Sequence, residues 1–334
     1  MHSFTPSRPA AGSRRRALWL AVGAVCAAAL PLAHAQGPNW PSRPVRIVVP
    51  YPAGGSSDVV ARLIAQSLQE ALGQPVVIEN KAGANGNIGA EFVANASDGH
   101  TFLLADVLAL AISGSVYTKL RFNPAKDLVG VGMLAYSPHL LVVHPSVPAN
   151  SIKELADLSK RESLNFAVTA IGSPPHLAGA AIARATGSQW QYIPYKGGAQ
   201  AITDTVGGQA QVLMNGMLAT LPHVQSGKLK VLGVSKRTRM ALIPNVPTLA
   251  ESGVPGFESG SWQGLLAPAG MPAAAMQRLN AELTRIIRSP DLRARLAAQG
   301  AEVSTMNPKE FAQFYAAEHE RWSKVVKDLA ITLD

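Results

Sequence analysis

The fold is decided by residues 45–58, VRIVVPYPAGGSSD. Residues 45–49 are β-branched and apolar almost throughout, a pattern typical of a parallel strand that is buried on both faces. Ser56 or Ser57 is expected to cap the helix that follows, and Asp58 lies in its first turn, where a carboxylate suits the helix dipole. The stretch therefore predicts a strand, a tight turn and the start of a helix.

The turn itself can bind an anion. Gly54 and Gly55 permit positive φ angles and leave backbone N–H groups bare. Bare N–H groups at the start of a helix form an anion site made of main chain. No Lys follows the glycines, so the turn is not a phosphate-binding GxxxxGK[ST] loop. We therefore expect it to hold a carboxylate or another small oxyanion.

The N-terminus has the pattern of a secretory signal. Arg14, Arg15 and Arg16 precede an apolar run at residues 17–30, which is too short to span a bilayer comfortably. An A-x-A site ends at Ala35, so cleavage there would release a periplasmic chain that consists of residues 36–334. A twin-arginine signal and a lipoprotein cysteine fit the pattern less well.

Composition narrows the class of protein. Residues 1–35 hold four arginines and no acidic residue, so their removal lowers the net charge from +9 to +5 and also removes the only cysteine. The remaining chain has no disulfide, and about 300 residues suffice for one large or two medium α/β domains. No basic run interleaved with aromatics indicates nucleic-acid binding, and no later apolar segment is long enough to cross a membrane.

An alternation of strands and helices continues from the opening stretch. Gly73 should end the first helix, and short strands are expected at residues 76–79 and 101–105, the latter ending at Asp106. Such a β-α-β-α-β run predicts a parallel sheet with a ligand at the carboxyl ends of its strands. A second glycine-rich turn, KAGANGNIG at residues 81–89, fits ligand contact and tight packing equally well.

The middle of the chain starts a second alternation. Ser137-Pro138-His139 separates two expected strands and suggests a connection from one sheet to another. Ser151 should cap a helix with Glu154 completing a capping box, and Ser173 should cap another. The strands expected in this region are residues 128–136, 140–143, 164–168, 191–195, 211–215 and 229–235.

Beyond residue 237 the pattern changes again. Residues 253–264 are expected to form a Gly/Ser loop around Trp262, followed by helices at residues 273–288, 291–298 and 308–329 that pack back on the first half. We expect an α/β fold of two lobes, each a mostly parallel sheet flanked by helices, with a ligand enclosed between them. The predicted lobes are residues 36–136 plus 237–334, and residues 137–236.

Motifs along nearly the whole mature chain resemble one family. They are Trp40-Pro41-Ser42-Arg43-Pro44, Pro50-Tyr51-Pro52-Ala53-Gly54-Gly55-Ser56-Ser57-Asp58, Glu79-Asn80-Lys81-Ala82-Gly83-Ala84-Asn85-Gly86, Lys153-Glu154-Leu155, Gly172-Ser173-Pro174-Pro175-His176-Leu177, Tyr195-Lys196-Gly197-Gly198, Gly227-Lys228-Leu229, Pro247-Thr248-Leu249-Ala250-Glu251-Ser252-Gly253 and Trp262. In this order the chain resembles the substrate-binding proteins of tripartite tricarboxylate transporters, also called Bug receptors (Bordetella uptake gene).

The resemblance implies a two-lobed periplasmic receptor, a Venus flytrap without cofactor or metal. It also implies a monomer that binds a small carboxylate and hands it to the permease subunits of a tripartite tricarboxylate transporter or presents it to a sensor protein. The implied ligand contacts are Tyr51, Pro52, Ala53, Gly54, Gly55, Ser56, Ser57 and Asn85 in the first lobe, and Gly172, Ser173, His176, Tyr195, Lys196, Gly197 and Asn215 in the second.

Two residues of the expected cleft depart from the family pattern. Asp106 stands where the family more often has a small hydroxyl residue, and an ionised Asp would repel a second carboxylate unless it accepts a ligand hydroxyl or amine. Asn215 is neutral where relatives that bind amino acids tend to carry Asp. These departures weaken the predictions that the ligand is citrate or an amino acid. A hydroxylated or aromatic monocarboxylate fits the sequence at least as well.

Other functions have less support in the sequence. His139 and His144 have no partner at metal-ligand spacing. No G-x-S-x-G elbow, H-E-x-x-H motif or exported cysteine indicates a hydrolase. A Ser57–His176 pair assembled across the cleft would be needed for catalysis, so a periplasmic hydrolase is the remote alternative. The chain is therefore expected to be a receptor and not an enzyme, serving either transport or signalling.

Overall fold

The structure is a computed structural model that describes residues 1–3, 40–304, 306–328 and 330–333. By its internal contacts the chain divides into two units, residues 1–39 and residues 40–334, and the second holds all the helices and strands described. The predicted signal, with its cleavage site after Ala35, lies almost wholly outside the described residues. Within the described residues, no helix is both long enough and apolar enough to cross a membrane.

The opening β-α-β-α-β run is confirmed. Strand β1 (Val45–Val49) pairs in parallel with β2 (Val76–Asn80) and β3 (Thr101–Asp106). Helices α2 (Ser56–Leu72) and α3 (Asn87–Ala94) connect them. Four of the five β1 side chains are fully buried, as expected for a strand covered on both faces. A left-handed glycine, Gly73, ends α2 as the sequence predicted.

The first lobe is completed by strands from distant parts of the chain. Strand β9 (Gly260–Pro268) lies antiparallel between β3 and β4 (Leu128–Val143), and the short β10 (Glu302–Val303) also pairs with β4. Two predictions are wrong here. Trp262 lies on a strand, not in a loop, and β4 is one strand of 16 residues that continues through Ser137-Pro138-His139.

The second lobe repeats the pattern of parallel strands. In it β5 (Asn165–Val168) pairs in parallel with β6 (Gln191–Pro194) and β7 (Val212–Gly216), while the far half of β4 pairs antiparallel with β7 and with β8 (Lys230–Val234). The sheet order is β2-β1-β3-β9-β4-β7-β5-β6. Each lobe therefore has a mixed sheet, not the mostly parallel one that was expected, because β4 and β9 run antiparallel to their neighbours.

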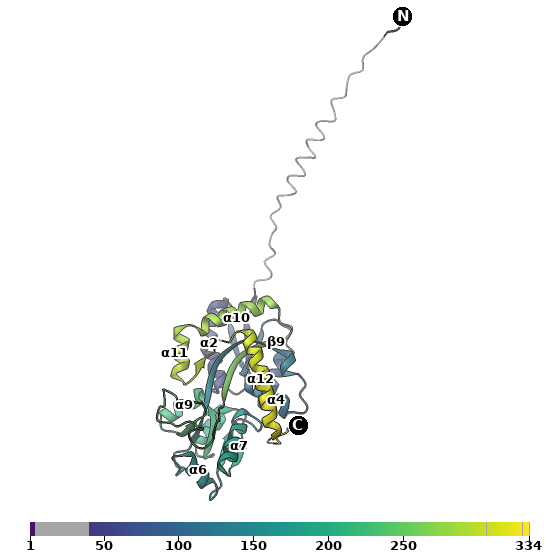
Figure 1. Ribbon diagram of the computed structural model, residues 1–334. Helices are drawn as coiled ribbons and strands as arrows, with labels where there is room; N and C mark the ends of the chain where they lie inside the picture. The colour runs from purple at the N-terminus through teal and green to yellow at the C-terminus, as the bar shows by residue number, and fades with distance from the viewer. Residues whose placement is uncertain (4–39, 305, 329, 334) are drawn as a thin grey trace. The chain divides into compact units, whose positions relative to one another are not determined.

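Helices flank both lobes (Figure 1). Those of the second lobe are α6 (Ile152–Ser159), α7 (Pro174–Thr186), α8 (Gly198–Val206) and α9 (Met217–Gln225). The oxygens of Ser151 and Ser173 cap α6 and α7, as predicted. The first lobe carries, besides α2 and α3, the helices α4 (Val107–Val116), α5 (Pro124–Asp127), α10 (Ala273–Ile287), α11 (Pro290–Ala298) and α12 (Pro308–Asp328).

The C-terminal helices pack on the first lobe, as predicted. Helix α10 lies against α2 and β4, and α12 lies against α4 and β4. Phe311 and Trp322 of α12 are almost fully buried, so the aromatic stripe of this helix contributes to the core. Because β4 and β9 run through the middle of the molecule, they form the sheet connection between the lobes (Figure 1).

The segment before β9 packs differently from the prediction, which returned the chain to the first lobe at residue 237. Leu249 and Val254 join the apolar core of the second lobe, and Thr248 forms a β-bridge with Val234. The return to the first lobe is made by β9. An apolar Leu-Ala pair followed by Gly/Ser-rich residues gives no sign in the sequence of which lobe it covers.

Candidate ligand-binding site

A small pocket lies where the two lobes meet. Its cavity of about 50 Å³ has room for only a handful of waters or a small solute. The lining residues are Tyr51, Gly55, Ser56, Ser57, Asn85, Asp106, Ala109, Thr169, Pro174, Pro175, Gly198, Asn215, Ser261 and Gln263. Seven of them were predicted as site residues, namely Tyr51, Gly55, Ser56, Ser57, Asn85, Asp106 and Asn215.

Asp58 organises the glycine turn that borders the pocket. Its Oδ2 accepts hydrogen bonds from the backbone N–H of Gly54 at 2.9 Å and from Nε of Arg62 at 2.9 Å, and its Oδ1 accepts from Asn80 at 3.0 Å. Burial raises the pKa of Asp58, but these donors outweigh it and hold the pKa below its ordinary value. Asp58 is thus an ionised anchor of the turn and does not line the pocket.

The serines of the turn do not cap α2, which corrects the prediction. Gly55 is the N-cap residue, and no side chain supplies a cap hydrogen bond. Ser57 instead donates to Oε1 of Gln263 on β9 at 2.7 Å. Gly55, Ser56 and Ser57 all line the pocket, so the hydroxyl of Ser56 and the N–H groups at the uncapped start of α2 are donors from which an anion there could accept.

Asn85 comes from an unusual turn. The residues Gly83, Ala84, Asn85 and Gly86 all have positive φ angles, of 137°, 44°, 54° and 94°. Positive φ is costly for Ala and tolerated by Asn, and such backbone is often held at functional sites. The Nδ2 of Asn85 is buried and has no hydrogen-bond partner among the described residues. It is therefore a free donor at the edge of the pocket.

Asp106 is the acidic group of the pocket. It ends β3, is only 8% exposed, and its Oδ1 accepts from the backbone N–H of Leu108 at 3.1 Å and of Trp262 at 3.2 Å. Burial raises the pKa of Asp106 to about 7, against the opposing effect of its hydrogen bonds from Trp262, Ser261 and the start of α4. Near neutral pH the carboxyl can therefore carry or release a proton.

The second lobe supplies the opposite wall. Asn215, which is 6% exposed, donates weakly to the hydroxyl of Thr220 at 3.4 Å, and its other amide atoms face Gly198. A β-carbon on Gly198 would lie 2.8 Å from Oδ1 of Asn215, so only glycine fits there. Pro174 and Pro175 close this side at the start of α7.

The loop before α7 does not line the pocket as predicted. Ser173 caps α7 and donates to the carbonyl of Ala170 at 2.7 Å, and Nδ1 of His176 accepts from the N–H of Gly172 at 3.1 Å. Burial lowers the pKa of His176, so the ring is neutral. Gly172, Ser173 and His176 thus support the wall, and the structure gives Ser57 and His176 separate partners.

The remaining predicted residues lie beside the pocket. Tyr195 and Lys196 line a neighbouring outer pocket of about 220 Å³, which shares Asn85 and Thr169 with the inner one. Pro52, Gly54 and Gly197 form contacts between the lobes: a β-carbon on Gly54 would lie 3.5 Å from Cβ of Ala199, and one on Gly197 2.6 Å from Pro52. Ala53 is exposed.

Seven lining residues were missed by sequence reasoning. Pro174, Pro175 and Gly198 adjoin predicted residues, and Ala109 and Thr169 follow predicted strands, whereas Ser261 and Gln263 lie on the strand that was predicted as a loop. The polar residues Ser259, Ser261 and Gln263 recur with period two, which is the signal that could have indicated a strand with one polar face.

The charges around the pocket limit its chemistry. Of the described residues that line it, none is Lys, Arg or His. In the described part of the chain, no group of three His, Cys, Asp or Glu side chains could hold a metal ion. The pocket offers hydroxyl, amide and backbone donors together with one buried carboxyl group, an arrangement suited to binding a polar solute.

Comparison with known proteins places the chain in a family. The model described as tripartite tricarboxylate transporter family receptor (TctC) matches residues 60–331. Protein BugT of Bordetella pertussis is 36% identical over 299 residues, which cover 88% of this chain and 92% of BugT.

Several solved structures resemble this chain in both sequence and fold. The periplasmic binding protein BugD is 34% identical with a TM-score of 0.84, covering 88% of this chain and 99% of BugD. Rpa4515 of R. palustris, solved with adipate, gives the same identity, coverage and TM-score. MatC of Rhodopseudomonas palustris, solved with bound malate, is 33% identical with a TM-score of 0.82, covering 86% of this chain and 100% of MatC. The family match over residues 60–331 and the identity to BugT show that this chain belongs to the tripartite tricarboxylate transporter receptor (TctC/Bug) family.

Proposed function

We propose that this chain is a periplasmic receptor that encloses a small carboxylate in the pocket between its lobes and delivers it to a tripartite tricarboxylate-type membrane transporter. The observation that carries the proposal is the pocket itself. It is bordered by the uncapped start of α2 on one lobe and by Asn215 and Gly198 on the other, so that a solute held there touches both lobes.

The carboxylate is proposed to bind at the turn of the first lobe. Backbone N–H groups at the start of α2, the hydroxyl of Ser56 and the unpartnered Nδ2 of Asn85 are donors on that side. Relatives solved with adipate and with malate support a carboxylate ligand. We propose that the first lobe consists of residues 36–136 and the chain from β9 onward, and that the second lobe consists of the residues between these two segments.

The binding step is tested by thermal unfolding of residues 36–334 against a library of carboxylates, sugars and amines. A ligand present at about 100 times its dissociation constant should raise the unfolding free energy by about 2.7 kcal/mol. Stabilisation by carboxylates alone supports the proposal. If a sugar or an amine stabilised the protein and no carboxylate did, the proposal would be overturned.

The substitution Gly54→Val tests whether the carboxylate binds at the glycine turn. Gly54 has φ of +85°, and Gly54→Val should abolish binding because a branched side chain distorts the turn that presents the N–H groups. Gly73→Val is the matched control, since Gly73 also has positive φ (67°) but lies at the far end of α2 with no atom near its β-carbon position. Unchanged affinity in folded Gly54→Val, or equal losses in both variants, would place the carboxylate elsewhere.

Delivery is tested in cells. Deleting the gene should abolish uptake of the radiolabelled ligand at low concentration, and the wild-type copy should restore it. Uptake that persists in the deletion strain, together with loss of a ligand-dependent signalling response, would contradict transport and support the sensor function instead.

A further inference from the structure

We propose that Asp106 selects the ligand by accepting a hydrogen bond from a hydroxyl or ammonium group that the ligand carries in addition to its carboxylate, and that Ser261 and His139 hold Asp106 in position for this. The inference rests on the proposed function, because it concerns the same pocket. It names the ligand class as hydroxy or amino carboxylates.

Helix capping does not account for Asp106 fully. Its Oδ1 accepts from the N–H groups of Leu108 and Trp262, which satisfies the start of α4. A cap of this kind needs one oxygen, and Asn serves as well as Asp at this position of a helix. Asp106 lines the pocket, and a carboxylate can accept about four hydrogen bonds, so it can accept one from a ligand in addition to its bonds within the protein.

The pocket holds no positive charge to pair with this carboxyl. Its described lining residues include no Lys, Arg or His, so only hydrogen-bond donors can complement Asp106. A ligand without a donor would bury its own atoms against an unsatisfied acceptor. Sites built to bind a ligand donor discriminate strongly against analogues that lack it, because the buried polar group then has no partner. A ligand that carries a hydroxyl or ammonium group can supply such a donor in addition to the hydroxyl of Ser261.

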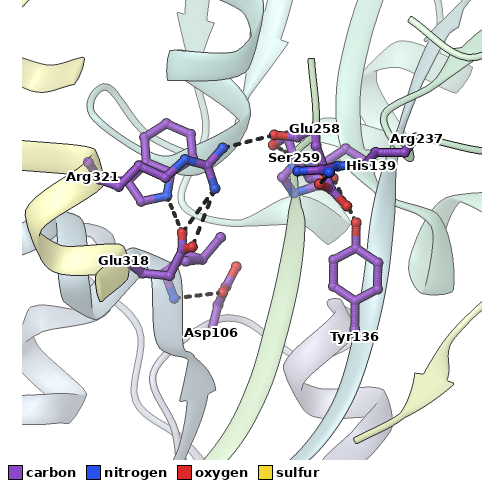
Figure 2. A network of polar contacts seen from close by, with 10 residues as sticks. Asp106, Tyr136, His139, Arg237, Glu258, Ser259, Glu318 and Arg321 are labelled. Carbon is purple, nitrogen blue, oxygen red and sulfur yellow. Dashed lines mark hydrogen bonds and ion pairs between the residues drawn. The ribbon is translucent and has the colours of Figure 1, made fainter. Parts of the chain in front are cut away.

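A buried chain of polar groups fixes the orientation of Asp106. The hydroxyl of Ser261 donates to the Asp106 carboxyl, and Nε2 of His139 lies 3.3 Å from Oγ of Ser261. Nδ1 of His139 lies 2.7 Å from Oγ of Ser259. Figure 2 shows His139, Ser259 and Tyr136 close together, and Asp106 with a hydrogen bond that it accepts from a backbone N–H.

The burial of His139 determines which groups donate and which accept in this chain of hydrogen bonds. His139 is fully buried, and burial lowers its pKa to about 3, so the ring is neutral. Because the Ser261 hydroxyl has a single hydrogen, donation to Asp106 makes it an acceptor for Nε2–H of His139. The backbone N–H of His139 in turn donates to Ser235 at 2.8 Å. His139 lies on β4 and Ser261 on β9, so two paired strands of the sheet hold Asp106 in place.

The test compares ligands that differ by one donor. Residues 36–334 are titrated by calorimetry with three series: succinate, L-malate and L-aspartate; propionate, L-lactate and L-alanine; glutarate, L-2-hydroxyglutarate and L-glutamate. In the series that binds best, we expect the hydroxy or amino member to bind at least tenfold more tightly than the unsubstituted acid. If the hydroxy member binds more tightly than the amino member, the partner of Asp106 is a hydroxyl group. If the amino member binds more tightly, the partner is an ammonium group.

Variants assign the preference to the proposed residues. Asp106→Asn keeps the cap oxygen but turns an N–H₂ donor toward the pocket, so the preference should fall to within about threefold. Ser261→Ala should reduce the preference at least threefold through loss of positioning, and it serves as the test if Asp106→Asn does not fold. Ser151→Ala removes the cap of α6, far from the pocket, and should lower stability without changing the preference.

The outcomes separate this inference from the proposed function. Carboxylates that bind without regard to the added donor, or a preference that survives in folded Asp106→Asn and Ser261→Ala, would overturn the role of Asp106 and leave the receptor function standing. If no member of any series binds while another carboxylate of the library does, the hydroxy or amino ligand class is overturned and the receptor function stands. A donor preference that is lost in Asp106→Asn and kept in Ser151→Ala confirms the inference.

Discussion

Gly197 of the second lobe lies so close to Pro52 of the first that a β-carbon on Gly197 would be 2.6 Å from Cδ of Pro52. A second contact of this kind joins Gly216 to Ser56, where the distance from a β-carbon to Oγ would be 2.7 Å. Both contacts join residues of the two lobes beside the pocket. The lobes therefore touch across the pocket, and glycine is what allows them to come this near.

Gly197→Val should keep the lobes apart. The φ angle of Gly197 is 167°, which any residue adopts, so the fold tolerates the change while the contact with Pro52 does not. We expect ligand affinity to fall at least tenfold and the radius of gyration with ligand, measured by small-angle X-ray scattering, to exceed that of the wild type. Gly270→Val, where no atom lies near the β-carbon position, is the control. Wild-type affinity in Gly197→Val would show that this contact is not needed for binding.

Leu177 joins the lobes at a second place. This fully buried side chain of α7 belongs to an apolar cluster with Ile112 and Val116 of α4 and Trp322 of α12. Leu177→Ala should cost about 2–5 kcal/mol of unfolding free energy and also weaken ligand binding, although Leu177 does not line the pocket.

Ile182→Ala is the matched control for Leu177, because Ile182 is equally buried on the same helix but belongs to the core of the second lobe alone. Denaturant unfolding and calorimetric titration of both variants provide the comparison. We expect similar losses of stability and a loss of affinity only in Leu177→Ala. Equal affinities in the two variants would contradict a role for this cluster in bringing the lobes together.

Asp58, which anchors the glycine turn, should make a measurable contribution to the free energy of unfolding. Asp58 has a side chain only 4% exposed and accepts three hydrogen bonds, so Asp58→Ala should cost about 1.5–3 kcal/mol and weaken carboxylate binding. Asp157 forms an ion pair with Lys153 on the solvent-facing side of α6, and Asp157→Ala should cost much less than Asp58→Ala because solvent screens an exposed pair. Urea unfolding measures both, and equal costs would show that the buried hydrogen bonds of Asp58 add nothing.

Asp106 should make stability depend on pH. Its pKa is about 7 in the folded protein and 3.8 in the unfolded chain, so between these values the folded state keeps a proton that the unfolded state releases. Unfolding free energy should therefore fall as pH rises from about 4 to about 7, by at most roughly 4 kcal/mol, and level off above that. Asp106→Asn removes this slope. Urea unfolding between pH 4.5 and 8 checks it, and parallel curves for wild type and variant would contradict the buried acid.

Local features of the fold could be predicted because they depend on neighbours in sequence. The β-branched run at Val45–Val49, the left-handed Gly73 and the caps at Ser151 and Ser173 each follow from a few adjacent residues. The glycine turn and Asp106 could also be assigned to the site, since they follow parallel strands whose carboxyl ends meet at one edge.

What could not be predicted depends on partners far along the chain. β9 has the composition of a loop because its glycines face bulky neighbours: a β-carbon on Gly260 would lie 2.4 Å from the Tyr136 ring, and one on Gly264 2.7 Å from Val107. Ser57 has the sequence context of a helix cap, yet its partner Gln263 is 206 residues away. Residues contributed by β9 were missed for the same reason.

The most direct test of the account is a crystal structure of residues 36–334 grown with the carboxylate that stabilises the protein most. We expect the ligand in the pocket between the lobes, with a carboxylate at the start of α2 beside Ser56 and Asn85, and with a hydroxyl or ammonium group toward Asp106. A ligand found in the outer pocket beside Lys196 or on the surface of one lobe, with the inner pocket holding only water, would contradict it.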